Sequence, residues 1–170
     1  MQKKKWFKLI NMIELNKKTQ QDFLNRDWVQ RLLDAGVNMD DAKYCIITIN
    51  STNKDYVLLN SQLLLREDWI DKYSYKAPTY TVSELLYKLH EWIYPKINGV
   101  EYSGGLILTK DAPFYPAYYS LVKNGNPVKE TEYIHADFEY PIESLASILI
   151  QCHKKDIGMT NHDIGNISSK

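Results

Sequence analysis

The sequence predicts an α+β domain, in which a small antiparallel sheet carries amphipathic helices packed mainly on one face. Apolar residues recur at helical spacing over residues 81–94 and 141–157, and short β-branched and aromatic runs separated by turn signals lie between them. No internal repeat or low-complexity linker interrupts the chain. We therefore expect one domain over residues 1–158, followed by a flexible polar tail over residues 159–170.

The first part of the chain is predicted to be helical. Residues 6–15 place apolar side chains at near-helical spacing, and a second helix is expected to begin near Thr19, in a segment that resembles a capping box. Gly36 follows the last periodic residue, where glycine supplies the left-handed conformation that ends a helix. N-terminal helices are thus expected over residues 6–36.

The two later helices are bounded more clearly. Thr81 is the expected N-cap of the first, with Glu84 three positions later, and Pro95 is expected to end it after Tyr94. The second opens with Pro141, which suits the first turn of a helix, and closes at Gly158.

Strands are predicted where β-branched and aromatic residues concentrate between polar turns. They are expected at residues 44–49, 55–59, 106–108, 118–122 and 130–136. Asn124-Gly125 is a strong turn signal between the last two. Residues 63–75 carry no clear period and are interpreted as a connecting segment with a possible helical turn.

Composition narrows the classes of partner. Lys plus Arg and Asp plus Glu are both 21, so the net charge is zero and gives no support to nucleic-acid binding. No run approaches the roughly 20 apolar residues of a membrane span.

The basic first eighteen residues lack a signal-peptide pattern and are expected to be retained. With only Cys45 and Cys152, the chain is expected to be cytoplasmic, with each thiol buried.

Three segments together resemble a known group of proteins. They are Gln30–Asn38 with Asp41-Ala42, then Pro78–Leu86, then Pro141–Ala146 leading into the last helix. In this order they resemble short uncharacterised proteins of gut Bacteroidetes genomes and their phages or mobile elements. The resemblance spans about residues 28–158 and consists of helix boundaries. It implies a bacterial or phage cytoplasmic protein and assigns no activity, cofactor or site residue.

Two groups of residues could in principle hold a metal ion. His135 and Asp137 would share one face of a strand while Glu132 points to the other, which gives two ligands where zinc needs three or four. A solvated strand edge is the simpler interpretation. Cys152 and His153 diverge by about 100° on a helix, so they cannot both reach an ion that His162 and Asp163 would complete.

Other histidines and thiols have simpler interpretations. His153 continues the apolar stripe of the last helix and is interpreted as the end of a core face, and His90 as a helix-flank residue. A nucleophilic Cys152 would need an orienting base that the sequence does not place. No cofactor or metal is expected.

Tyrosine is the unusual feature of the composition, with 13 in the chain. Phe114, Tyr115, Tyr118 and Tyr119 cluster around two prolines. Core and hairpin packing is ranked first, a protein-binding surface second, because tyrosine is enriched at interfaces, and stacking on single-stranded nucleic acid third.

These observations favour a non-enzymatic accessory protein that acts through protein contacts. The candidate binding surface is Phe114, Tyr115, Tyr118 and Tyr119. The alternative is a small metal-dependent hydrolase that uses Glu132, His135 and Asp137.

Overall fold

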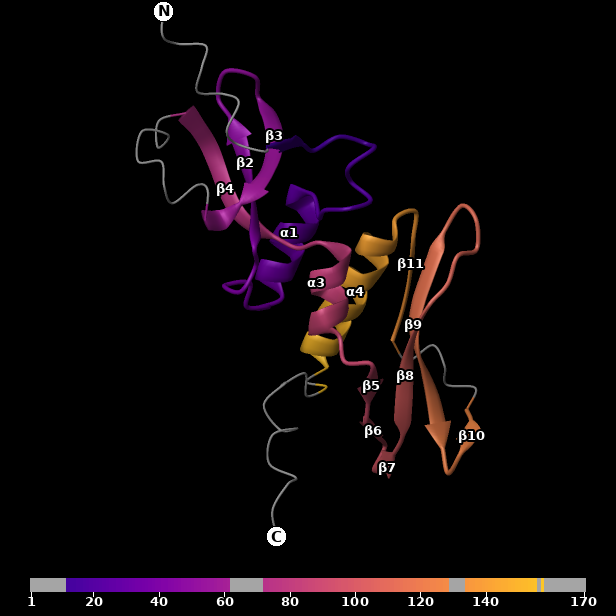
Figure 1. Cartoon of the computed structure of the whole chain (residues 1–170). Coiled ribbons are helices and arrows are strands. Elements are labelled where there is room, and N and C mark those ends of the chain that lie inside the picture. The colour runs from indigo at the N-terminus through magenta and orange to yellow at the C-terminus, as the bar shows by residue number, and fades with distance from the viewer. Residues whose placement is uncertain (1–11, 62–71, 129–133, 156, 158–170) are drawn as a thin grey trace, which may run out of the picture. The chain divides into compact units, whose positions relative to one another are not determined.

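The structure is a computed structural model that describes residues 12–61, 72–128, 134–155 and 157 (Figure 1). The chain divides into two compact units, Met1–Leu85 and Leu86–Lys170. The two units are described separately below, and the single domain over residues 1–158 stays a prediction. The tail over residues 159–170 lies outside the described residues.

The first unit contains a four-stranded antiparallel sheet of order β1-β3-β2-β4. The strands are β1 (Ile13–Glu14), β2 (Tyr44–Ile49), β3 (Lys54–Leu59) and β4 (Tyr73–Thr79). The β2–β3 hairpin matches the predicted strands and polar turn, and Asn53 adopts a positive φ of 50° in that turn. The hairpin prediction is therefore confirmed.

Helix α1 (Arg26–Asp34) contacts β4 and buries Trp28, Val29 and Leu32. Thr79 is fully buried, and its hydroxyl donates to the backbone oxygen of Leu24 across 3.0 Å. This bond connects the segment before α1 to the end of β4. On the sheet, Cys45, Ile47 and Leu58 alternate with the residues facing the other way and form a separate buried cluster.

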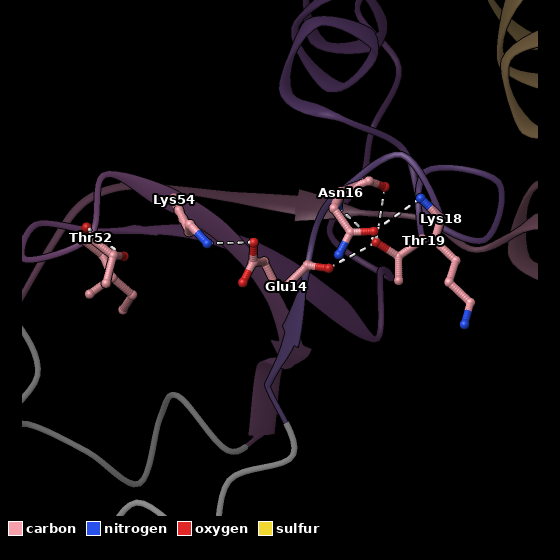
Figure 2. Close-up of polar contacts among 7 residues, drawn as sticks. Glu14, Asn16, Lys18, Thr19, Thr52 and Lys54 are labelled. Atoms are coloured by element: carbon pink, nitrogen blue, oxygen red, sulfur yellow. Dashed lines mark hydrogen bonds and ion pairs between the residues drawn. The ribbon is translucent and has the colours of Figure 1, made fainter.

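The predicted N-terminal helices over residues 6–36 need correction. Ile13 and Glu14 form strand β1 rather than part of a helix, and residues 6–11 lie outside the described residues. The Glu14 carboxylate pairs with Lys54 Nζ at 2.8 Å, so β1 is held to β3 by an ion pair in addition to strand pairing (Figure 2). Pairing with β3 has overridden the weak helical period of this segment.

Thr19 does not cap a helix. Its hydroxyl donates to the backbone oxygen of Glu14 and accepts from the backbone N–H of Asn16, which closes a turn (Figure 2). Side-chain hydrogen bonds of this kind compete with helix formation. The N-cap is Asn25, whose side chain accepts from Trp28 N. The helix end was predicted correctly, since Gly36 has a φ of 81° just after it.

Strand β4 was not predicted, because residues 63–75 were interpreted as a connecting segment. Residues 73–75 belong to β4, which continues through Lys76 and Pro78. Proline is tolerated in a strand at the edge of a sheet, the position that β4 holds here. Residues 63–71 lie outside the described residues.

Helix α3 (Val82–Lys88) begins with the predicted capping box. Thr81 Oγ1 accepts from the N–H of Glu84, and the Glu84 carboxylate accepts from the N–H of Thr81 across 2.8 Å. The predicted end at Tyr94 is wrong, because the helix stops at Lys88 and Trp92-Ile93 forms strand β5. Pro95 therefore lies in an extended segment and does not end the helix.

The second unit contains an antiparallel sheet of order β10-β9-β8-β5, in which β11 also pairs with β9 (Figure 1). Its strands are β5 (Trp92–Ile93), β8 (Ser103–Leu108), β9 (Tyr115–Lys123), β10 (Asn126–Pro127) and β11 (His135–Phe138). A short pair, β6 (Lys96–Ile97) and β7 (Val100–Glu101), makes a two-stranded sheet. The predicted pairing of residues 106–108 with 118–122 is confirmed.

The predicted third strand over residues 130–136 can be compared with the structure only over residues 134–136. Residues 129–133 lie outside the described residues, and β11 begins at His135 and ends at Phe138. It pairs with β9, placing Ala136 opposite Ala117.

Helix α4 (Pro141–Lys154) packs against β9 and β11. Pro141 lies in its first turn, as predicted. Ser144 is fully buried and its hydroxyl accepts from Phe138 N across 3.1 Å, which connects the helix start to β11. The C-cap is Lys155, and the predicted closing residue Gly158 lies outside the described residues. The helices and antiparallel sheets together confirm the α+β fold class, although the sheet is not a single one.

Candidate binding surface

The sheet of the second unit has two chemically different faces. The inner face carries Ala117, Tyr119 and Leu121 of β9, which are fully buried, and α4 contacts this strand. The opposite face, called the outer face here, follows from the strand registers. Its residues are Trp92, Ser103, Gly105, Ile107, Pro116, Tyr118, Ser120, Val122, His135 and Asp137.

The four aromatic residues predicted as one surface are separated by the strand. Tyr119 is fully buried on the inner face, and its hydroxyl donates to the backbone oxygen of His90 across 2.7 Å. Burial raises the pKa of this phenol. Tyr118 points to the outer face, because neighbouring residues in a strand alternate. Tyr119 is therefore a core residue, and only Tyr118 of this pair can contact a partner.

The other two members lie near the tip of the β8–β9 hairpin. Phe114 is 45% exposed, and its backbone exchanges hydrogen bonds with Asp111 across the turn. Tyr115 shares the inner side of β9 with Tyr119, and Lys110 Nζ lies 5.8 Å from the centre of its ring. The exposed Phe114 and the half-buried Tyr118 thus lie at different places.

Trp92 is the largest exposed side chain on the outer face. It lies opposite Gly105 in the register, and a methyl group built on Gly105 would stand 3.5 Å from Cη2 of its indole ring. The indole therefore covers the position where β8 has no side chain. The ring remains 52% exposed, so its other side is accessible to a partner.

A second part of the outer face is built by β9 and β11. Tyr118 stands opposite both Ile107 and His135, and the Tyr118 and His135 rings lie 6.3 Å apart at a tilt of 36°. The His135 backbone oxygen accepts from Gln151 Nε2 of α4 across 2.7 Å, which fixes the start of β11. Asp137 is exposed one step further along this face.

Sequence reasoning placed His135 and Asp137 on one face of a strand, and the register agrees with that placement. Glu132, the third member of the proposed set, lies outside the described residues. Within residues 12–61, 72–128, 134–155 and 157, no three His, Cys, Asp or Glu side chains gather closely enough to hold a metal ion. His162 and Asp163 also lie outside the described part.

The two residues of the α4 pair differ in burial, and only one of them agrees with the prediction. Cys152 is fully buried, and burial raises the pKa of its thiol to about 12, so it does not resemble an activated nucleophile. His153 is exposed and does not end a core face, which corrects the prediction. Cys45 is likewise buried, and burial raises its pKa.

His90 follows α3 rather than lying on its flank. Its backbone oxygen holds Tyr119, and its buried Nε2 has no hydrogen-bond partner in the part of the chain that the structure describes.

The sequence analysis missed Trp92 as a surface residue. Its spacing from Leu85 and Leu89 matches a helix, which hid the strand. The signal that could have revealed it is Gly104-Gly105, since glycine pairs in a strand mark places where another group approaches closely.

Among the described residues, no helix is long and apolar enough to cross a membrane. Comparison of the chain with protein-family models, curated protein sequences and solved structures gives no match.

Proposed function

We propose that this chain is a non-enzymatic accessory protein that binds a protein partner through the outer face of its second unit. The observation that supports the proposal most directly is the contiguity of Trp92, Ile107 and Tyr118 on that face. The Trp92 ring covers Gly105, and Ile107 is the next β8 residue on the same side, opposite Tyr118. Aromatic residues that combine an apolar body with a polar tip are enriched at protein interfaces.

The charges of the face favour a particular kind of partner. None of the outer-face residues named above is a Lys or Arg, and Lys96 of β6, which continues the Trp92 side of the edge, stands opposite the acid Glu101. The face therefore lacks the basic groove that would hold a phosphate backbone. Asp137 is exposed and makes no hydrogen bond or ion pair with any other described residue. A protein segment with an apolar side chain for Trp92 and Ile107 and a Lys or Arg for Asp137 complements this arrangement.

The spacing of these groups sets the length of that segment. Asp137 lies opposite Pro116, four β9 residues from Ser120, which lies beside Gly105 and the Trp92 ring. Asp137 on β11 and Gly105 on β8 are thus four residues and two strand spacings apart. With about 3.4 Å per residue and about 4.8 Å between strands, these two positions lie about 17 Å apart. About five extended residues span this distance.

A random-peptide display library selected on the purified protein tests this proposal. We expect enriched peptides with apolar residues and a Lys or Arg about five positions away. Tyr118→Ser and Asp137→Lys should each weaken their binding at least tenfold, whereas Asp22→Lys, at an exposed acid of the first unit, should not. Peptides that bind all the variants equally, or a library without enrichment, would rule out this face.

A second experiment addresses the alternative, a metal-dependent hydrolase using Glu132, His135 and Asp137. Elemental analysis of the purified protein should detect no stoichiometric zinc. Stoichiometric metal that is lost in His135→Ala would instead support the hydrolase.

The cytoplasmic location and bacterial or phage origin rest on the cysteine content and on the resemblance, and they belong to this proposal too.

A further inference from the structure

The β5 side of the second sheet is one continuous edge. Strand β5 pairs with β8 through Ile93 and Gly104, and β6 pairs with β7 through Lys96 and Glu101. The chain advances by the same number of residues from Ile93 to Lys96 as from Glu101 to Gly104. The two pairings therefore belong to one unbroken register. The Tyr102 N–H donates to the Pro95 oxygen across 3.0 Å, in the same register. Residues 91–97 therefore form one edge strand, turned at Asn98-Gly99 by positive φ angles of 50° and 81°.

The alternation of hydrogen bonds along this edge shows which backbone groups are already paired within the sheet. The Leu106 N–H donates to the Glu91 oxygen across 2.9 Å, so Glu91, Ile93 and Pro95 direct their backbone groups toward β7 and β8. Trp92, Tyr94 and Lys96 consequently direct theirs away from the sheet. None of these three makes a backbone hydrogen bond on that side to any residue the structure describes.

Proline often protects an edge strand from pairing, but Pro95 does not protect this one. Proline blunts an edge by removing an N–H. Pro95, however, belongs to the residues whose backbone faces the sheet, so its missing N–H falls on the paired side. The outward side keeps the N–H groups of Trp92, Tyr94 and Lys96. Their side chains are also open, since Trp92 is 52% and Tyr94 76% exposed.

We propose that this edge pairs with the same edge of a second copy of the chain, antiparallel and centred on Tyr94, so that the two sheets continue across a twofold axis. In that register Tyr94 faces Tyr94 of the second copy, and Trp92 faces Lys96 of the second copy. The backbone N–H and C=O groups of all these residues point away from their own sheet. The two residues of each pair can therefore donate an N–H···O bond to one another.

The side chains favour this register over its alternatives. Tyr94 against its copy is an aromatic cross-strand pair, and Lys96 beside the Trp92 indole of the second copy is a cation–π pair. A register centred on Lys96 would place two ammonium groups opposite one another, which is unfavourable. A register centred on Trp92 would leave Lys96 beyond the paired residues. The residue pattern is therefore self-complementary, as a twofold interface requires.

Sedimentation equilibrium of the full chain tests the association, and circular dichroism checks that each variant folds. We expect the wild type to dimerise with rising concentration. Tyr94→Pro removes the outward N–H and the phenol ring but no hydrogen bond within the sheet, and it should weaken dimerisation at least tenfold. Asp22→Lys, at an exposed acid in a turn of the first unit, is the control and should dimerise like the wild type. A wild type that stays monomeric at its solubility limit, or a Tyr94→Pro variant that dimerises fully, would overturn the proposal.

Cysteine crosslinking tests the register and does not depend on a proline variant. Directly opposed residues of a hydrogen-bonded pair have Cα atoms roughly 5.5 Å apart, within disulfide range. Tyr94→Cys should therefore oxidise to a covalent dimer. Trp92→Cys should crosslink to Lys96→Cys in a mixture and not to itself. Equal crosslinking of Tyr87→Cys, an exposed position on α3, would show random collision and contradict the register. Both experiments use the purified chain alone, so they are independent of the peptide selection.

Discussion

The phenol of Tyr80 donates a hydrogen bond to Oδ1 of Asp41 across 2.7 Å, and the backbone oxygen of Asn38 lies 3.2 Å from the same hydroxyl. Tyr80 follows β4 and is only 1% exposed, whereas Asp41 precedes β2. One buried side chain therefore ties the turn after α1 to the end of the edge strand.

Removing this hydroxyl should destabilise the first unit. Tyr80→Phe keeps the ring and loses the hydrogen bond to a charged acceptor, so we expect the free energy of unfolding to fall by about 1.5–3 kcal/mol. Urea titration followed by circular dichroism measures it. Tyr87→Phe, at a position that is 79% exposed, is the control and should change stability by less than about 0.5 kcal/mol. Equal effects of the two would remove the special role of Tyr80.

Glu84 should matter more than an ordinary helix-start residue. Its Oε2 accepts from the N–H and the hydroxyl of Thr81, and its Oε1 accepts from the N–H of Lys43 at the start of β2, across 2.9 Å. Glu84→Ala removes all of these bonds and should cost about 2–3 kcal/mol. Thr81→Ala removes the two bonds of the Thr81 hydroxyl but keeps those that Glu84 accepts from the Thr81 and Lys43 N–H groups, and should cost about 1 kcal/mol. Thermal unfolding should rank the two variants in this order, and the reverse order would contradict it.

Two adjacent glycines of β8 should respond differently to alanine. A Cβ on Gly104 would stand 2.7 Å from Cδ2 of Leu121 and 3.3 Å from Cγ1 of Ile93, both of them core side chains. Gly104→Ala should therefore destabilise the second unit by about 1–3 kcal/mol. The three atoms nearest to a Cβ on Gly105 all belong to the Trp92 ring, at ordinary contact distances of 3.5–3.7 Å. Gly105→Ala should be neutral in the same denaturation assay, and Leu121→Val should restore part of the loss in Gly104→Ala.

Stability should decline in alkali because of two buried phenols. Burial raises the pKa of Tyr80, with the Asp41 hydrogen bond acting in the same direction, and burial raises the pKa of Tyr119. In the unfolded chain both titrate near pH 10. Above that pH the folded state binds more protons than the unfolded state, so the free energy of unfolding falls as pH rises.

This alkaline loss should shrink when the phenols are removed. Between about pH 10 and 12, Tyr80→Phe combined with Tyr119→Phe should give a shallower decline than the wild type. Urea midpoints across that range measure the slope. Tyr87→Phe, at an exposed site, should keep the wild-type slope. An unchanged slope in the double variant would assign the alkaline loss to other groups.

The sequence predicts the structure well wherever local signals and tertiary pairing agree. The Thr81–Glu84 box, the β2–β3 hairpin and the Pro141 helix start are all local patterns, and all three are present. The prediction fails where pairing overrides periodicity. Ile93 stands at helical spacing from Leu89, yet its backbone pairs with Gly104 in a strand.

The candidate surface could be predicted only in part, for the same reason. Alternation along a strand already implies that Tyr118 and Tyr119 point to opposite faces, so the split of the aromatic cluster was accessible from sequence. The approach of Trp92 to Gly105 joins residues from different strands, and it depends on a register that no local pattern encodes.

Strand β9 has a consequence for how the second unit opens. It pairs with β8 along one side and with both β10 and β11 along the other, so Tyr118 is bracketed by Ile107 and His135. Opening the centre of β9 requires its neighbours to separate first. Its central amides should therefore be the last in this unit to exchange with deuterium, while in the monomer those on the outward side of residues 91–97 exchange at once.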